Sequence, residues 1–176
     1  MKKVALVLAA AGIVPAGVAL AQTSGLKVTG GGQVLTGNGS GAGNTIAFNA
    51  QQTAPADQNT GEAPARGQLQ VINREAGTGQ SQERFHGDVT CIREFTPQSG
   101  PNQGQRFVRF GGFQQVNGSD TATPFTVDVQ DNGEPNHGQD MIFFRQRQSG
   151  DDPCDTSDQS TDFSNTALAR GNVKEH

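Results

Sequence analysis

Residues 125–144 read FTVDVQDNGEPNHGQDMIFF. Apolar and polar side chains alternate over 125–130, which predicts a half-buried strand. Its inward residues are Phe125, Val127 and Val129, and its outward residues are Thr126, Asp128 and Gln130. Asp-Asn-Gly at 131–133 predicts a tight turn, because Asn and Gly tolerate positive φ. The apolar run 141–144 predicts a returning strand that is covered on both faces. The stretch is therefore expected to be a β-hairpin, and it points to an all-β fold.

Strand patterns recur through the rest of the chain, separated by clusters of Gly, Asn, Pro and Ser. The expected strands are 26–35, 45–51, 67–73, 84–95, 105–116, 123–131, 139–147 and 166–173. Almost no stretch has helical periodicity. About eight short strands with Gly-rich loops predict an antiparallel β-barrel or sandwich.

The stretch 84–95, RFHGDVTCIREF, has the clearest strand pattern. Phe85, Val89, Cys91 and Phe95 share one parity and are expected to face the core together. Further along the chain, the pair Gly111-Gly112 predicts a bulge or bend in its strand.

The N-terminus has the features of a secretory signal. Two lysines precede an apolar stretch that ends in Ala19-Leu20-Ala21, the charge, core and cleavage-site pattern of a signal peptide. The apolar run is too short for a good membrane span, and no second one follows. We expect 1–21 to be a signal peptide and 22–176 to be a single β domain, secreted or located at the cell envelope.

The charge and the cysteine count limit the function further. Removing Lys2 and Lys3 reduces the basic residues from 13 to 11 against 17 acidic ones, a net charge of −6. A net acidic chain with scattered arginines is a poor nucleic-acid binder.

The two cysteines, Cys91 and Cys154, predict one disulfide in an exported chain. They lack CxxC spacing, which argues against redox or zinc chemistry.

The hairpin turn contains one candidate metal site. Asp131, Glu134 and Asp140 supply the oxygen ligands that calcium prefers. A strict EF-hand loop starting at Asp128 is not expected, since Gln139 would stand at the position of its final glutamate. The alternative is a solvated turn shaped by Asp-Asn-Gly, and the sequence favours it.

A second candidate lies in the acidic segment 151–162. Asp151, Asp152 and Asp155 repel one another there, and a calcium ion would relieve that repulsion. A solvated acidic loop is the simpler interpretation. No cofactor other than calcium is expected at either place.

The sequence offers little for catalysis. His86 and Asp88 share one face of the 84–95 strand, but no nucleophile can be assigned to them. There is no G-x-S-x-G elbow. The chain is therefore expected not to be an enzyme.

Several stretches in order resemble one exported bacterial family. These are KVTGGGQ at 27–33, IAFNA at 46–50, GQLQVI at 67–72, RFHG at 84–87, FTVDVQDNGEP at 125–135 with Asp140, and GNV at 171–173. Together they resemble the post-COAP domain family over nearly the whole mature chain. The resemblance implies a small, mostly β, exported domain found beside or within cell-surface proteins. It implies no catalytic residues.

Three functions stay open at this point. The first is a non-catalytic exported domain that acts in binding or surface structure, with a surface protein or a ligand as partner. The second is a carrier of a small apolar ligand inside a lipocalin-like barrel, because about eight strands leave room for side chains or one small molecule. The third is a hydrolase that uses His86. Six phenylalanines in predicted strands favour a filled core over a cavity.

Overall fold

The computed structural model describes residues 25–34, 44–73, 83–100, 102–116, 123–133, 140–155 and 168–176. These residues form eight strands and no helix, which confirms the all-β prediction. The strands are β1 (Lys27–Val34), β2 (Asn44–Gln52), β3 (Ala63–Asn73), β4 (Glu83–Phe95), β5 (Phe107–Val116), β6 (Thr123–Gln130), β7 (Met141–Gln146) and β8 (Leu168–Glu175).

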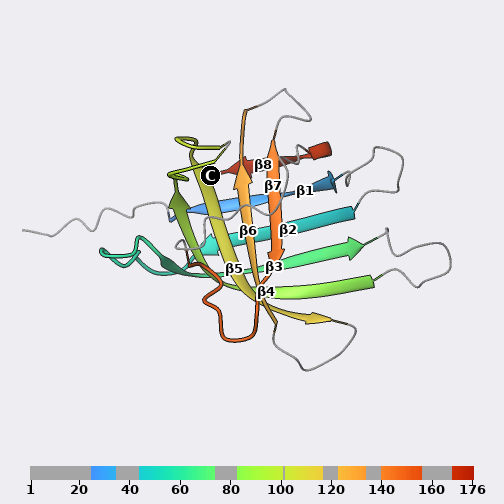
Figure 1. The fold of residues 1–176 in the computed structure, drawn as a ribbon, viewed down its shortest axis with the longest axis horizontal. Coiled ribbons are helices and arrows are strands. Elements are labelled where there is room, and N and C mark those ends of the chain that lie inside the picture. The colour runs from blue at the N-terminus through green and yellow to red at the C-terminus, as the bar shows by residue number, and fades with distance from the viewer. Residues whose placement is uncertain are drawn as a thin grey trace, which may run out of the picture.

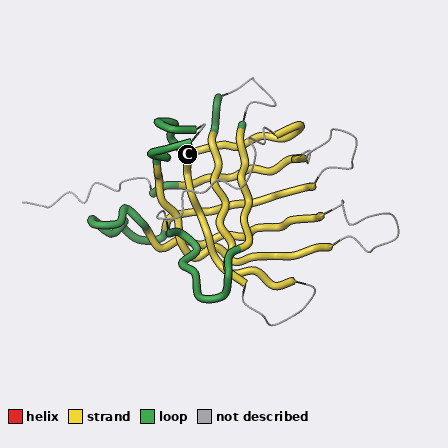
Figure 2. The backbone as a smooth tube through the Cα atoms, in the orientation of Figure 1, coloured by secondary structure: helices red, strands yellow, loops and turns green. Residues whose placement is uncertain are grey.

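All eight strands belong to one antiparallel sheet, in the order β7-β6-β5-β4-β3-β2-β1-β8. The sheet bends over itself, so that β6 and β7 cross in front of β1, β2 and β3 (Figure 1). Figure 2 shows the same crossing of two layers, with loops at the rims. The result is a nearly closed barrel. The sequence patterns predicted either a barrel or a sandwich. Because all eight strands belong to one sheet that bends over itself, the fold is a barrel.

The interior of the barrel is filled by apolar side chains from both layers. Phe48 of β2 and Phe110 of β5 stack with ring centroids 5.1 Å apart. Phe125 is fully buried, and its ring lies over Gly87, where a Cβ atom would overlap it. The predicted inward residues of β6 all lie in this core, together with Val28, Ile46, Leu69, Val71, Val89, Ile92, Val108, Ile142, Leu168 and Val173.

A bulge in β4 overturns one sequence prediction. Val89 pairs with Gly112 and Cys91 pairs with Gly111, so β4 has one extra residue at this point. Side chains after the bulge change face. Ile92 therefore enters the core, while Cys91 faces away from it. The prediction that Cys91 and Phe95 share the core face with Val89 is wrong, although Cys91 is buried.

A second, smaller layer covers the outer face of β4 to β7. Phe107 packs against Phe95 and Phe143, with ring centroids 5.7 and 5.8 Å apart. Residues 147–155 lie over Thr126 and Asp128, which are 3% and 6% exposed. These two residues do point away from the core as predicted, but they are buried by this outer layer. Phe143 is buried as well, as expected for a strand covered twice.

Two aspartates connect the ends of the sheet across the gap between β7 and β8. The Asp140 carboxylate accepts the backbone N–H of Val173 at 2.8 Å and that of Asn132 at 3.0 Å. The Asp140 carbonyl accepts the N–H of Leu168, and the Asp131 carboxylate accepts that of Glu175. These bonds satisfy edge groups that a ladder would otherwise pair.

The expected signal peptide, 1–21, lies outside the described residues. In the part of the chain that is described, no helix has the length and apolar character needed to cross a membrane.

Candidate functional site

A buried ion pair lies at the centre of the outer layer. Arg109 of β5 binds Asp128 of β6 with two hydrogen bonds, Nε to Oδ1 at 2.7 Å and Nη2 to Oδ2 at 2.8 Å. The guanidinium also lies 4.4 Å from the ring centre of Phe95. Its Nη1 donates to the carbonyl of Asp155. A bidentate geometry and an aromatic face suit a desolvated arginine.

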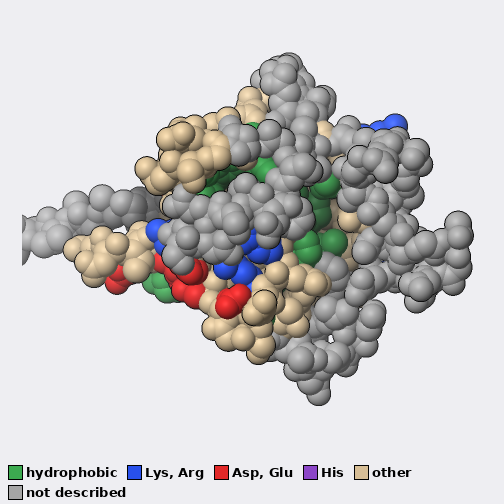
Figure 3. Space-filling model, in the orientation of Figure 1, with side chains coloured by type: hydrophobic (Ala, Val, Ile, Leu, Met, Phe, Trp, Pro, Cys, Tyr) green, Lys and Arg blue, Asp and Glu red, His purple; other side chains and the backbone are tan. Residues whose placement is uncertain are grey.

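The segment 147–155 is attached to this pair at several points. Arg147 donates to the Thr126 hydroxyl at 2.9 Å and to the Asp155 carbonyl at 3.0 Å. The Thr126 hydroxyl donates to the carbonyl of Pro153 at 2.6 Å. Figure 3 views this face and shows basic side chains beside a group of acidic ones. The segment is thus held by polar contacts on a surface that the sequence pattern placed in solvent.

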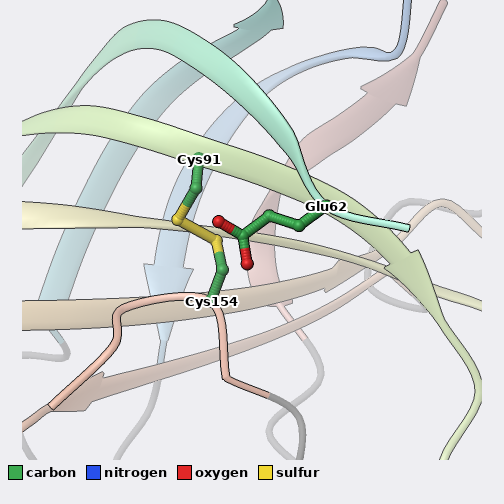
Figure 4. A group of neighbouring side chains, drawn as sticks. All are labelled: Glu62, Cys91 and Cys154. Carbon is green, nitrogen blue, oxygen red and sulfur yellow. A yellow bond between two sulfur atoms is a disulfide. The ribbon is translucent and has the colours of Figure 1, made fainter. Parts of the chain in front are cut away.

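The predicted disulfide between Cys91 and Cys154 is present, and it closes 63 residues. Its two residues are 5% and 0% exposed. The Glu62 carboxylate points toward the sulfur atoms (Figure 4). Glu62 has a pKa above its ordinary value, first because burial disfavours its charge and then because Asp152 lies nearby.

Charged residues form a row across the outer face of the sheet. The register sets Arg93 of β4 directly opposite Arg109 of β5, and Arg109 opposite Asp128. Glu62 lies on the other side of Arg93, close enough for attraction between the two charges to oppose the rise in its pKa. Arg109 is neutralised by Asp128. In the described part of the chain the Arg93 guanidinium makes no ion pair or hydrogen bond, and its Nε is buried without a partner.

A pocket of about 530 Å³ opens at the end of the barrel where β4 and β8 finish. Its apolar lining comes from Leu26, Ala56, Ala63 and Ile92. Its polar lining comes from Gln52, Arg93, Glu94, Arg106, Glu175 and His176. We call this the mouth pocket. The volume lies within the range of small-molecule sites, and apolar walls with a few charged groups are typical of them.

Arg106 holds one wall of the mouth pocket in place. It donates to Glu94 and to Glu175, each at 2.5 Å. Hydrogen bonding to these carboxylates raises the pKa of Arg106, and the bond from Arg106 lowers the pKa of Glu94. The Arg106 side chain is about half exposed, so its pairs with the two glutamates are screened by solvent. Arg106 is therefore already paired, whereas Arg93 forms no ion pair with any residue that the structure describes.

The structure gives Asp131 and Asp140 a role other than metal binding. Both Asp140 oxygens accept backbone N–H groups, and Asp131 accepts those of Gly133 and Glu175. Glu134 lies outside the described residues, as does His137. A calcium site at this turn stays a prediction.

The acids of the second candidate calcium site support local turns. Asp151 accepts the backbone N–H of Gln148, and Asp152 accepts that of Cys154. Asp155 contributes its backbone carbonyl to Arg109 and Arg147. Calcium binding here also stays a prediction, because residues 156–167 are not described.

His86 is exposed on the outer face of β4, as expected from its parity. Its cross-strand neighbours are Gln70 and Gln115, neither of which is a nucleophile.

A second hollow of about 520 Å³ lies on the same side of the barrel and is lined by polar residues that include Asn49, Arg66 and Asp88.

Sequence reasoning missed the residues that make the mouth pocket. Arg93 and Arg106 looked like scattered arginines, and Glu62 lay in a presumed loop. The alternation within 84–95 places Arg93 on the same face of the strand as Cys91. Only the β4 bulge and the pairing with β5 bring Arg93 beside Arg109.

Comparison with known proteins adds no relative: no family model matches, and neither the curated proteins nor the solved structures contain a match. The resemblance to the post-COAP family therefore stays a prediction from the sequence.

Proposed function

We propose that this chain is an exported, non-catalytic binding domain and that the mouth pocket is its ligand site. The main supporting observation is the pocket itself, about 530 Å³ with apolar and charged walls at one end of the barrel. The signal-like N-terminus and the disulfide support export, since disulfides persist in oxidising compartments. The post-COAP resemblance agrees with such a role.

The other two functions have less support. A ligand inside the barrel would compete with Phe48, Phe110 and Phe125, which occupy the described interior. A hydrolase at His86 would need a nucleophile beside it, and its cross-strand neighbours are glutamines. The mouth pocket is therefore the better place for a ligand.

A fragment titration followed by NMR tests the proposal. Mixtures of neutral, anionic and cationic small molecules are added to the ¹⁵N-labelled chain without its signal segment. We expect saturable shifts at Leu26, Ala63 and Ile92, and recovery of the bound compound unchanged by mass spectrometry. If no fragment moves these signals, the pocket is not a ligand site. If a bound compound is consumed, the domain is not a mere binder.

A further inference from the structure

The mouth pocket contains a cation that has no counter-ion at contact distance among the described residues. Its other arginine, Arg106, is shared by Glu94 and Glu175. Arg93 takes part in no ion pair of the described residues, and its Nε is buried without a hydrogen-bond partner. Buried donors without partners are rare, and each calls for an explanation. A bound anion would give the charge of this guanidinium a partner.

The register makes this unpaired state costly. Arg93 and Arg109 stand directly opposite each other on neighbouring strands, and like charges in that arrangement destabilise a sheet. Three of the five Arg109 N–H groups are already donated, two to the Asp128 carboxylate and one to the Asp155 carbonyl, and Arg109 is not among the residues that line the mouth pocket. An anion at Arg93 would remove the repulsion without disturbing the Arg109 pair.

Glu62 only partly balances the positive charge of Arg93. Its carboxylate points toward the disulfide (Figure 4), Glu62 is not among the residues that line the pocket, and no ion pair of the described residues joins it to Arg93. Asp57, Asp152 and Asp155 further oppose its ionisation. Among the residues that the structure describes, no acid therefore pairs with Arg93 on the side of the pocket.

The remaining walls favour a ligand that has an apolar part as well. Leu26, which is partly exposed, and Ala56, which is exposed, offer apolar surface, while Ala63 and Ile92 lie buried in the wall behind them. Resting on the proposed function above, we infer that the mouth pocket selects small carboxylates with a short apolar tail and that Arg93 binds the carboxylate. Arginine suits this role, because its planar fork matches a carboxylate in two parallel hydrogen bonds.

A matched series of six-carbon probes tests the inference. Hexanoate, 1-hexanol and hexylamine have the same tail and differ in the charge of the head group. We expect hexanoate to shift the mouth-pocket signals at millimolar concentrations and to bind about tenfold or more tightly than hexanol, as a charge-assisted hydrogen bond predicts. Hexylamine should bind more weakly still, because it meets Arg93 with a like charge.

Three single variants test whether Arg93 is the residue that recognises the carboxylate. Arg93→Gln should weaken hexanoate binding about tenfold or more and leave hexanol binding unchanged. Arg66→Gln removes the same charge from the second hollow, outside the mouth pocket, and should have no effect. Arg93→Lys keeps the charge without the fork and should restore part of the affinity. Far-UV CD and the melting temperature check that each variant is folded.

The outcomes separate the two proposals. Equal binding of hexanol and hexanoate, or an unchanged hexanoate affinity in Arg93→Gln, overturns carboxylate selection and leaves the mouth pocket as a ligand site. If neither the six-carbon probes nor the mixed fragments shift its signals, the carboxylate inference and the proposed function fall together.

Discussion

Asp140 accepts the backbone N–H of Val173 at 2.8 Å, which ties the start of β7 to β8 across the gap in the barrel. The same carboxylate accepts the N–H of Asn132 at 3.0 Å, and Asp140 is 3% exposed. A residue that looked like a calcium ligand in the sequence thus closes the sheet by side-chain hydrogen bonds.

Replacing Asp140 should open this closure. Asp140→Ala leaves two backbone N–H groups without their acceptor and is expected to cost about 2–4 kcal/mol of unfolding free energy. Asp140→Asn keeps one acceptor oxygen and should cost about half as much. Urea unfolding followed by far-UV CD measures both. Equal stability of Asp140→Ala and the parent chain would show that the closure contributes nothing.

Calcium should not stabilise the chain if these aspartates are already engaged by backbone N–H groups. We expect the same melting temperature in millimolar calcium and in EDTA. A site held at about 100 times its dissociation constant would add about 2.7 kcal/mol, a rise of several degrees. Such a rise would restore the predicted ion sites, and Asp131→Ala against Asp155→Ala would tell the two apart.

The buried pair Arg109–Asp128 should be sensitive to loss of either partner. Asp128→Ala leaves Arg109 buried without its carboxylate and is expected to cost about 3–5 kcal/mol. Glu94→Ala breaks a half-exposed pair with Arg106 and should cost about 1 kcal/mol or less. Chemical denaturation of both variants tests the contrast. Similar losses would mean that the outer layer does not shield its pair from solvent.

The disulfide should contribute substantially to stability. In the chain-entropy model, closing 63 residues stabilises the fold by about 4 kcal/mol. The double variant Cys91→Ser with Cys154→Ser is expected to lose about that amount, as measured by urea unfolding. Reducing the parent chain with a phosphine should reproduce the loss. A much smaller effect would show that the polar contacts of Arg109 and Arg147 hold the segment 147–155 without it.

Glu62 and Glu94 should have opposite effects on the pH dependence of stability. Burial, followed by Asp152, raises the pKa of Glu62, so the folded chain holds this proton more tightly than the unfolded chain does. This contribution to the stability of the folded chain is fully present below the ordinary pKa of a glutamate. It is lost as the pH rises through the raised pKa of Glu62. At pH 7 the charged carboxylate is therefore unfavourable, and Glu62→Gln should melt at a higher temperature than the parent. At pH 4 the difference should disappear.

Glu94 is the matched control for this experiment. The hydrogen bond from Arg106 lowers the pKa of Glu94, so its contribution is present above the ordinary pKa and is lost as pH falls through the lowered value. Glu94→Gln should melt slightly lower than the parent at pH 7. Melting temperatures of the two variants from pH 4 to pH 8 measure the two slopes. Slopes of the same sign would contradict this account.

The candidate site could be predicted only in part. Two cysteines in a chain with a predicted export signal were enough to predict the disulfide. The mouth pocket was not predictable, because its residues come from segments far apart in the sequence, such as Leu26, Arg93 and Glu175. The face of Arg93 also depended on a one-residue bulge opposite Gly111-Gly112, and the parity of a strand cannot be counted through a bulge without knowing its place.

The sequence by itself determined the strand content, because alternation within each strand and Gly-rich or Asn-rich breaks between strands are local properties of the chain. It determined the inward face of β6 for the same reason. Only the tertiary structure decided that Asp140 closes a barrel, that residues 147–155 bury Thr126 and Asp128, and that Arg93 lines a pocket without an ion pair to any described residue. Each of these depends on which segments meet in space, and pairing between distant strands is set by the packing of the whole sheet rather than by any one stretch.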